Sequence, residues 1–168
     1  MTDLQALERR IRALEDIEAI TQVMHDYWYA LDLKRWDALA DCFTADVEAD
    51  YGRPDWRHSG RDALVEWLHA NESGERYKVS HAGHNPRVKL VGDDEATGLF
   101  KLHDWVRIEP SITLRSWGHY DMRFVREADG KWRIKRLGLD YVYKEEHLCY
   151  VGNAPPEMTP ALSGPESK

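Results

Sequence analysis

The stretch FVREADGKWRIKR, residues 124–136, decides how the second half of the chain should fold. Asp129 and Gly130 stand between two segments that mix apolar and charged residues, and an Asp-Gly pair adopts the positive φ angles of a tight turn at little cost. In the second segment, KWRIKR, apolar residues alternate with basic ones, which is typical of a strand with one solvated face. The stretch therefore predicts a β-hairpin.

The sequence around this hairpin, from Lys78 onward, is typical of β-strands. Strands are predicted at 78–91, 95–109, 112–127 and 131–144, with turns at 92–94, 109–111 and 128–130.

Helices dominate the first half of the chain. Leu4, Leu7, Ile11, Leu14 and Ile17 recur at helical spacing, with a break expected at Asp16, which would cap a second helix. Further helices are predicted from an Asp37 cap over 37–43 and over 61–70, with a short strand at 47–51. Helices followed by hairpins predict an α+β fold. We expect a strongly curved antiparallel sheet that the N-terminal helices close into a cone-shaped barrel with a buried hollow.

Composition narrows the classes of function. The net charge of −7 argues against a nucleic-acid binder, which needs a basic face to neutralise phosphates. No apolar run approaches a membrane span, and MTDLQALERR lacks the apolar region of a signal peptide. Two cysteines fit a reducing cytoplasm better than a disulfide scaffold. We expect one domain over 1–148, with a helical extension over about 1–15, and a Pro/Gly/Ser-rich tail over 149–168.

The central functional question is why Asp32 lies in the otherwise core-like segment YWYALDLKRW, residues 27–36. His81, in the first long strand, offers an answer. A carboxylate beside an imidazole fixes the tautomer of the ring and makes it a competent base near neutral pH. A buried aspartate can stay charged if it accepts such a hydrogen bond. Each residue alone is more readily explained as structural, so the pair carries the hypothesis.

Other residues are candidates for a pocket rich in aromatic rings. Trp28 is four residues before Asp32 and therefore shares its helical face. Tyr51, at the end of the first strand, could donate a phenol hydrogen bond to a substrate oxygen. On the third long strand Trp117, His119 and Asp121 alternate onto one face, which is either solvated or lines the cavity.

Metal and cofactor signals are weak. His81 and His84 are three apart in a strand and point to opposite faces, and no third ligand is near, so no metal site is predicted. We find no serine nucleophile elbow, phosphate loop or dinucleotide fingerprint. Acid–base chemistry without a cofactor is what remains.

These residues carry a family likeness. DIEAI at 16–20, YWYALDLKRWDAL at 27–39, SHAGHNP at 80–86 and DGKWRI at 129–134 together resemble the SnoaL-like branch of the nuclear transport factor 2-like fold. Within that branch, residues 14–148 look most like the scytalone dehydratase and bile acid 7α-dehydratase families. The resemblance implies a conical α+β barrel, usually a trimer, and an Asp–His pair that falls on Asp32 and His81.

The resemblance also assigns roles to further positions. The catalytic tyrosines fall on Tyr27 and Tyr51, and a polar pair of the scytalone dehydratases falls on His119 and Asp121, which implies that their face looks inward. A second catalytic histidine falls near Val106, an apolar position in this chain.

The predicted function is a cofactor-independent lyase of dehydratase type. His81, oriented by Asp32, would act on a ring-bearing, largely apolar small molecule such as a steroid, a polyketide or a lignin-derived aromatic. A retro-aldol lyase, an isomerase or a cyclase on the same scaffold stays open. So does a non-catalytic ligand binder like the small subunits of ring-hydroxylating dioxygenases. The expected partners are the small molecule and further copies of the chain, with a trimer favoured, and neither nucleic acid nor membrane.

Overall fold

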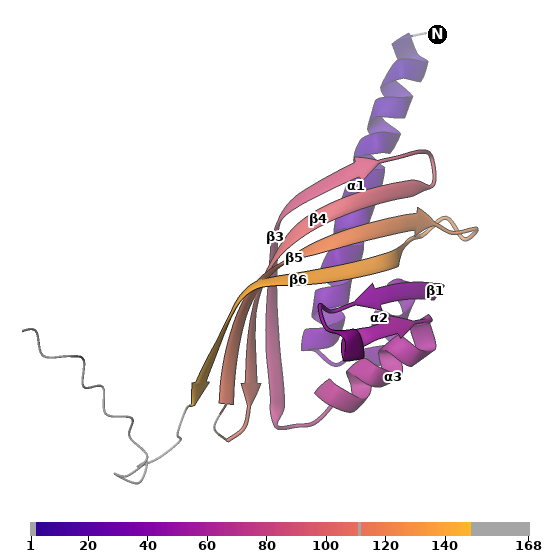
Figure 1. Cartoon of the computed structure of the whole chain (residues 1–168). Helices are drawn as coiled ribbons and strands as arrows, with labels where there is room; N and C mark the ends of the chain where they lie inside the picture. Colours follow the sequence, from indigo (N-terminus) through magenta and orange to yellow (C-terminus); the bar gives the residue numbers. More distant parts are fainter. Residues whose placement is uncertain (1–2, 111, 149–168) are drawn as a thin grey trace, which may run out of the picture.

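A computed structural model describes residues 3–110 and 112–148 of the chain. The predicted tail over 149–168 lies outside these residues. Figure 1 shows helices packed beside a sheet whose long strands bend sharply near their middles. The elements are α1 (Asp3–Asp32), α2 (Trp36–Asp41), β1 (Phe43–Asp50), η1 (Pro54–Trp56), β2 (Arg57–Ser59), α3 (Arg61–Glu72), β3 (Tyr77–Leu90), β4 (Glu95–Ile108), β5 (Ile112–Arg126) and β6 (Trp132–Leu148).

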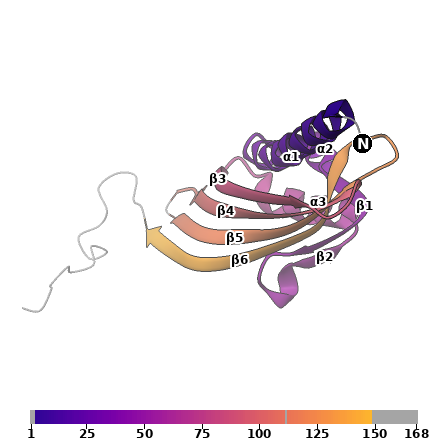
Figure 2. The same cartoon turned by 90° about the horizontal axis from the view of Figure 1, so that it is seen from above.

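The strands form one six-stranded sheet in the order β2-β1-β6-β5-β4-β3. The predicted α+β class and the curved sheet with N-terminal helices are confirmed. Two details differ from the expectation. The sheet is mixed, because β1 pairs with β6 in parallel. It is also unclosed among the described residues, since β2 and β3 are its two edges. Seen from above, α1 and α2 lie along one side of the fanned strands (Figure 2).

The bending of the long strands has local causes. The β5–β6 pairing shifts register between Trp117 and Gly118 and again between Arg123 and Phe124. The β3–β4 pairing shifts between His84 and Arg87, where Asn85 has a positive φ of 54°. An extra residue on one strand of a pair bends that strand and increases its twist. These irregularities give the sheet a concave inner face.

The expected helix break at Asp16 is wrong. Helix α1 runs without interruption from Asp3 to Asp32. Asp16 is buried and accepts hydrogen bonds from Arg126 Nη2 at 2.7 Å and from Trp132 Nε1 at 3.1 Å. Asp16 therefore fastens the middle of α1 to the β5–β6 hairpin. The predicted Asp37 cap is also wrong, because α2 begins at Trp36 and Asp37 lies in its first turn.

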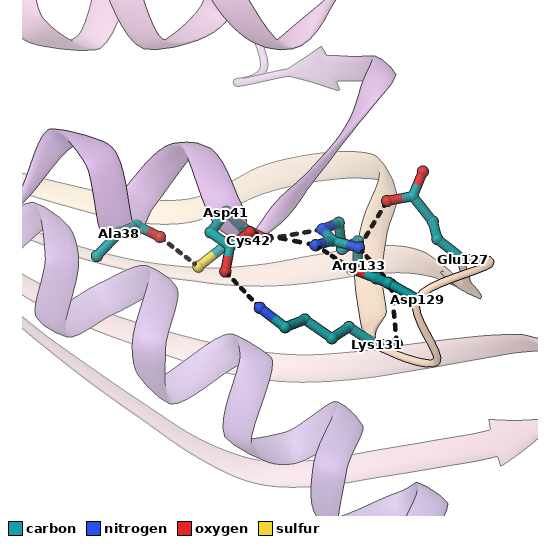
Figure 3. Close-up of polar contacts among 7 residues, drawn as sticks. All are labelled: Ala38, Asp41, Cys42, Glu127, Asp129, Lys131 and Arg133. Carbon is teal, nitrogen blue, oxygen red and sulfur yellow. Dashed lines mark hydrogen bonds and ion pairs between the residues drawn. The ribbon is translucent and has the colours of Figure 1, made fainter.

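Arg133 makes a second polar connection between the β5–β6 hairpin and a helix, here the end of α2 (Figure 3). Its guanidinium donates to Asp41 Oδ1 at 3.1 Å, to Glu127 Oε2 at 2.7 Å and to Asp129 Oδ2 at 2.8 Å. The Arg133 hydrogen bond, followed by one from the Lys131 backbone, lowers the pKa of Asp129 to about 2. The end of α2 and the predicted hairpin turn thus share one cation.

A single apolar core lies between the helices and the inner face of the sheet. Tyr27 is its centre on α1, with edge-to-face contacts to Phe43 at 5.8 Å and to Tyr120 at 6.1 Å between ring centroids. Phe100 and Phe124 continue the ring cluster on the sheet, at 6.2 Å from each other. No helix in the described part of the chain is long and apolar enough to cross a membrane.

Candidate active site

Asp32, the last residue of α1, contacts His81 near the start of β3. Asp32 Oδ1 lies 2.7 Å from His81 Nδ1, and the backbone N–H of His81 donates to Oδ1 at 3.2 Å and to Oδ2 at 3.1 Å. The two side chains are only 17% and 8% exposed, respectively. Hydrogen bonds to an ionised acceptor offset much of the cost of burying it. The contact therefore explains a carboxylate at the end of a core helix.

The geometry fixes which nitrogen of His81 is available for chemistry. An ionised carboxylate can only accept a hydrogen bond, so the Nδ1 that faces Asp32 carries the ring proton. In the neutral ring Nε2 is then unprotonated and able to take a proton. Among the described residues Nε2 has no hydrogen-bond partner.

His81 lines a cavity of about 800 Å³ between the inner face of the sheet and α3. This volume lies within the range of small-molecule sites. Asp32 is not among the lining residues and stands behind His81. Aromatic rings form much of the wall: Tyr27, Tyr51, Trp56, Trp67, Tyr77, Tyr120 and Tyr141.

Two of the predicted tyrosines meet in this cavity. The hydroxyl oxygens of Tyr27 and Tyr51 lie 3.0 Å apart, and both residues are buried. Burial is the main cause that raises the pKa of each phenol above its ordinary value. Both phenol hydroxyls therefore stay protonated and can donate hydrogen bonds to an oxygen that gains negative charge.

Two carboxyl groups that sequence analysis missed also line the cavity, Glu72 and Asp104. Asp104 is the Cα partner of His81 in the β3–β4 pairing. For each of these two carboxyl groups, the spacing of neighbouring apolar residues could have predicted that its side chain points inward. Asp104 replaces an apolar residue in the inward alternation of Phe100, Leu102 and Val106, and Glu72 follows Leu64 and Leu68 at spacings of four along α3.

Trp28 does not line the cavity, contrary to the prediction that it contacts substrate. Its indole is 5% exposed and packs within the core against Phe100 and Tyr120. A Cβ at Gly83 would lie 1.8 Å from Trp28 Cη2, so the ring occupies the space that a side chain would fill. Trp28 thereby sets how closely α1 approaches β3, two residues beyond His81.

The predicted substrate contacts on β5 are also wrong in their placement. His119 and Asp121 are exposed on the outer face, because the inner positions of β5 are Ser116 and Tyr120, which line the cavity. Asp121 lies 3.8 Å from Arg136, and Trp117 stacks on His103 at 4.6 Å between centroids. Sequence analysis left open whether this face of β5 is solvated or lines the cavity, and the structure shows that it is solvated.

Val106, where the resemblance placed a second histidine, is buried and lines the cavity as an apolar residue. His84 is exposed. In the ranges 3–110 and 112–148 no three His, Cys, Asp or Glu side chains converge as metal ligands. A second cavity, of about 760 Å³, lies between α1, α2 and the β5–β6 turn and contains none of the predicted site residues.

The fold and the cavity define the class of protein: a helix-backed, strongly curved α+β sheet with a small-molecule cavity on its inner face. The family model described as "SnoaL-like domain" matches residues 12–138. The chain belongs to this family, as its sequence motifs suggested.

Solved structures agree with this assignment. A protein from Novosphingobium aromaticivorans with the provisional name scytalone dehydratase is 27% identical, with a TM-score of 0.74 over 87% of this chain and 99% of that chain. Hexachlorocyclohexane dehydrochlorinase LinA type 2 is 21% identical, with a TM-score of 0.74 over 88% and 98%. LinA type 3 from Novosphingobium barchaimii is 20% identical, with a TM-score of 0.73 over 88% and 99%. The two LinA structures share the fold.

Proposed function

We propose that the protein is a cofactor-independent lyase that eliminates water from a ring-bearing, largely apolar small molecule. The observation that carries the proposal is the 2.7 Å contact between Asp32 Oδ1 and His81 Nδ1 at the wall of an aromatic cavity. The names of two similar structures, a dehydratase and a dehydrochlorinase, describe eliminations and support the same reaction class.

The proposed reaction begins with His81. Its Nε2 takes a proton from a carbon next to a substrate carbonyl, and Asp32 stabilises the imidazolium that forms. Tyr27 and Tyr51 donate hydrogen bonds to the carbonyl oxygen while it carries negative charge. The electrons of the broken C–H bond form a carbon–carbon double bond as the carbon–oxygen bond breaks. The departing hydroxyl takes up one proton, which balances the proton that His81 removed, and the products are an unsaturated ketone and water.

A non-catalytic ligand binder is the rival from another class. It would not need Asp32 and His81 in contact, and it would be favoured by a cavity filled with side chains. The short contact and the open volume of about 800 Å³ both favour the enzyme. Retro-aldol cleavage and isomerisation would use the same base and differ in their products.

The test is turnover of ring-bearing β-hydroxy ketones, followed by the ultraviolet absorbance of the conjugated product and by product mass. Loss of one water supports dehydration, an unchanged mass indicates isomerisation or cyclisation, and loss of a carbonyl fragment indicates retro-aldol cleavage. The proposal fails if Asp32→Asn and His81→Ala both turn over the substrate at the wild-type rate.

We also propose that the chain assembles as a homo-oligomer, with a trimer favoured, in the cytoplasm. Large apolar side chains are exposed on the strands: Leu99 at 47%, Trp105 at 38%, Val142 at 65% and Tyr143 at 55%. A contiguous apolar patch marks an interaction site, and we propose that these side chains form one. Light scattering coupled to gel filtration gives the number of copies, and cell fractionation tests the location.

A further inference from the structure

We propose that Glu72 is the general acid of this cavity and gives its proton to the oxygen that leaves the substrate. The inference rests on the proposed elimination and assigns its second proton transfer to a residue outside the Asp32–His81 pair. It starts from two buried oxygen atoms, Glu72 Oε2 and Asp104 Oδ1. Neither atom is accessible, and neither has a hydrogen-bond partner in the described part of the chain.

The positions of these atoms point to a ligand. Glu72 is the last residue of α3 and follows two buried residues of that helix, Leu64 and Leu68, so its side chain is carried under the helix into the cavity. Asp104 is 5% exposed and stands opposite His81 on the neighbouring strand. A buried polar atom without a partner is costly, and it is expected where a ligand supplies the missing bond.

The surroundings of Glu72 favour its protonated form. Burial, the largest cause, raises the pKa of this carboxyl to about 7, and the negative charges of Asp104 and Asp32 act in the same direction. His81 and Lys34 act against them when positively charged. The groups that face Glu72 from the elements around it are Asp32, Lys34, Tyr51, Tyr77, His81, Asp104 and Tyr141.

This arrangement couples the two proton transfers. When His81 Nε2 takes the carbon-bound proton, the new positive charge lowers the pKa of Glu72. Glu72 then releases its proton as the carbon–oxygen bond breaks, and the departing hydroxyl becomes water. The cycle ends with His81 protonated and Glu72 ionised, and exchange with solvent returns the proton from the ring to the carboxyl group. Asp104 acts as a positioning residue whose charge keeps Glu72 protonated before the reaction.

The test uses two substrates that differ only in whether the leaving group needs a proton from a general acid. Both are bicyclic aromatic ketones, with either a hydroxyl or a 4-nitrophenoxy group on the carbon β to the carbonyl. Nitrophenolate leaves without a proton, whereas hydroxide does not. We expect Glu72→Gln to eliminate water at least about 100-fold more slowly and to release nitrophenolate within about threefold of the wild-type rate. Glu66→Gln, at an exposed position of the same helix, is the matched control and should change neither rate.

The outcomes separate this inference from the proposed function. Retained water elimination in Glu72→Gln, or an equal loss of both reactions, overturns the acid role, while loss of both reactions in His81→Ala still supports the base. Equal rates in wild type and His81→Ala for both compounds overturn the proposed function instead.

A titration tests the proton on Glu72 without any substrate. The carboxyl carbon of Glu72, assigned by its absence in Glu72→Gln, should titrate by nuclear magnetic resonance with a midpoint of about 7. Asp104→Asn should move this midpoint, and the alkaline limb of the pH profile of water elimination, to lower pH. A midpoint near 4.3, the value of an exposed glutamate, overturns the inference.

Discussion

Asp32 holds His81 by both its ring and its backbone. The carboxylate lies 2.7 Å from Nδ1 and within 3.2 Å of the backbone nitrogen, so the same group sets the tautomer of the ring and the position of the strand that carries it. A substitution at Asp32 therefore tests two consequences at once, the strength of the base and its placement.

Asp32→Asn should lower kcat/KM for water elimination about 10²–10⁴-fold, because an amide does not stabilise the imidazolium. The measurement is the initial rate of enone formation. Asp121→Asn, at the exposed outer face of β5, is the matched control and should keep the wild-type rate. An Asp32→Asn enzyme of full activity would contradict the assigned role of this carboxylate.

The Tyr27–Tyr51 pair should act mainly on the chemical step. Tyr51→Phe removes one donor to the carbonyl oxygen, so kcat should fall by about 10²-fold with a small change in KM. The lost hydrogen bond to Tyr27 should also lower the free energy of unfolding by about 1 kcal/mol.

Steady-state kinetics and urea denaturation measure these two effects. Tyr29→Phe removes the hydroxyl of a tyrosine that is 66% exposed and serves as the control. A rise in KM at constant kcat would instead assign Tyr51 to ground-state binding.

Glu72 should make stability fall as the pH rises from about 4.5 to 7. Its pKa is raised from 4.5 to about 7 on folding, so within this window the folded chain keeps a proton that the unfolded chain has released. The stability that the proton provides is fully present below pH 4.5 and is lost as the pH passes 7. A shift of this size corresponds to roughly 3 kcal/mol.

Urea denaturation of wild type and Glu72→Gln at several pH values measures this effect. The difference between their free energies of unfolding should change in favour of the variant between pH 5 and pH 8. A difference that stays constant over that range would contradict a raised pKa.

Gly83→Ala should destabilise the protein and weaken the site, because its Cβ would lie 1.8 Å from Trp28 Cη2. We expect a loss of about 1–3 kcal/mol in the free energy of unfolding as the ring and α1 shift. Gly92→Ala, where an added Cβ meets nothing within 4 Å, is the matched control in urea denaturation.

A smaller side chain at position 28 should relieve the clash with the Cβ of Gly83→Ala. Trp28→Leu combined with Gly83→Ala should be less destabilising than the sum of the two single changes. Strict additivity would show that Trp28 is not what fills the space above Gly83.

The sequence predicted the four long strands to within a few residues, because one apolar face and one solvated face give a regular alternation along most of β4 and β5. The contact between Asp32 and His81 could also be anticipated, since a core aspartate needs a partner. The uninterrupted α1 could not, because Asp16 is capable of capping a helix. Its actual partners, Arg126 and Trp132, are distant in the chain.

The cavity was predicted less well than the fold. Alternation shows that His119 and Asp121 share a face but does not say which face is inward, and the resemblance pointed to the wrong one. Glu72 lies beyond the helix predicted over 61–70, although its spacing from Leu68 continues the buried side of α3. Glu72, Asp104 and His81 lie on three different elements, α3, β4 and β3. Only the folded structure therefore shows that the two carboxyl groups are near the base.

The separation of 49 positions between Asp32 and His81 gives the dyad a property that neither residue has alone. During synthesis the aspartate emerges long before its partner, and the base exists only once the end of α1 has settled on β3. A chain in which that helix detaches retains every residue of the site yet has no oriented imidazole. Proton abstraction therefore reports on the docking of one helix, and activity should vanish before the sheet itself unfolds.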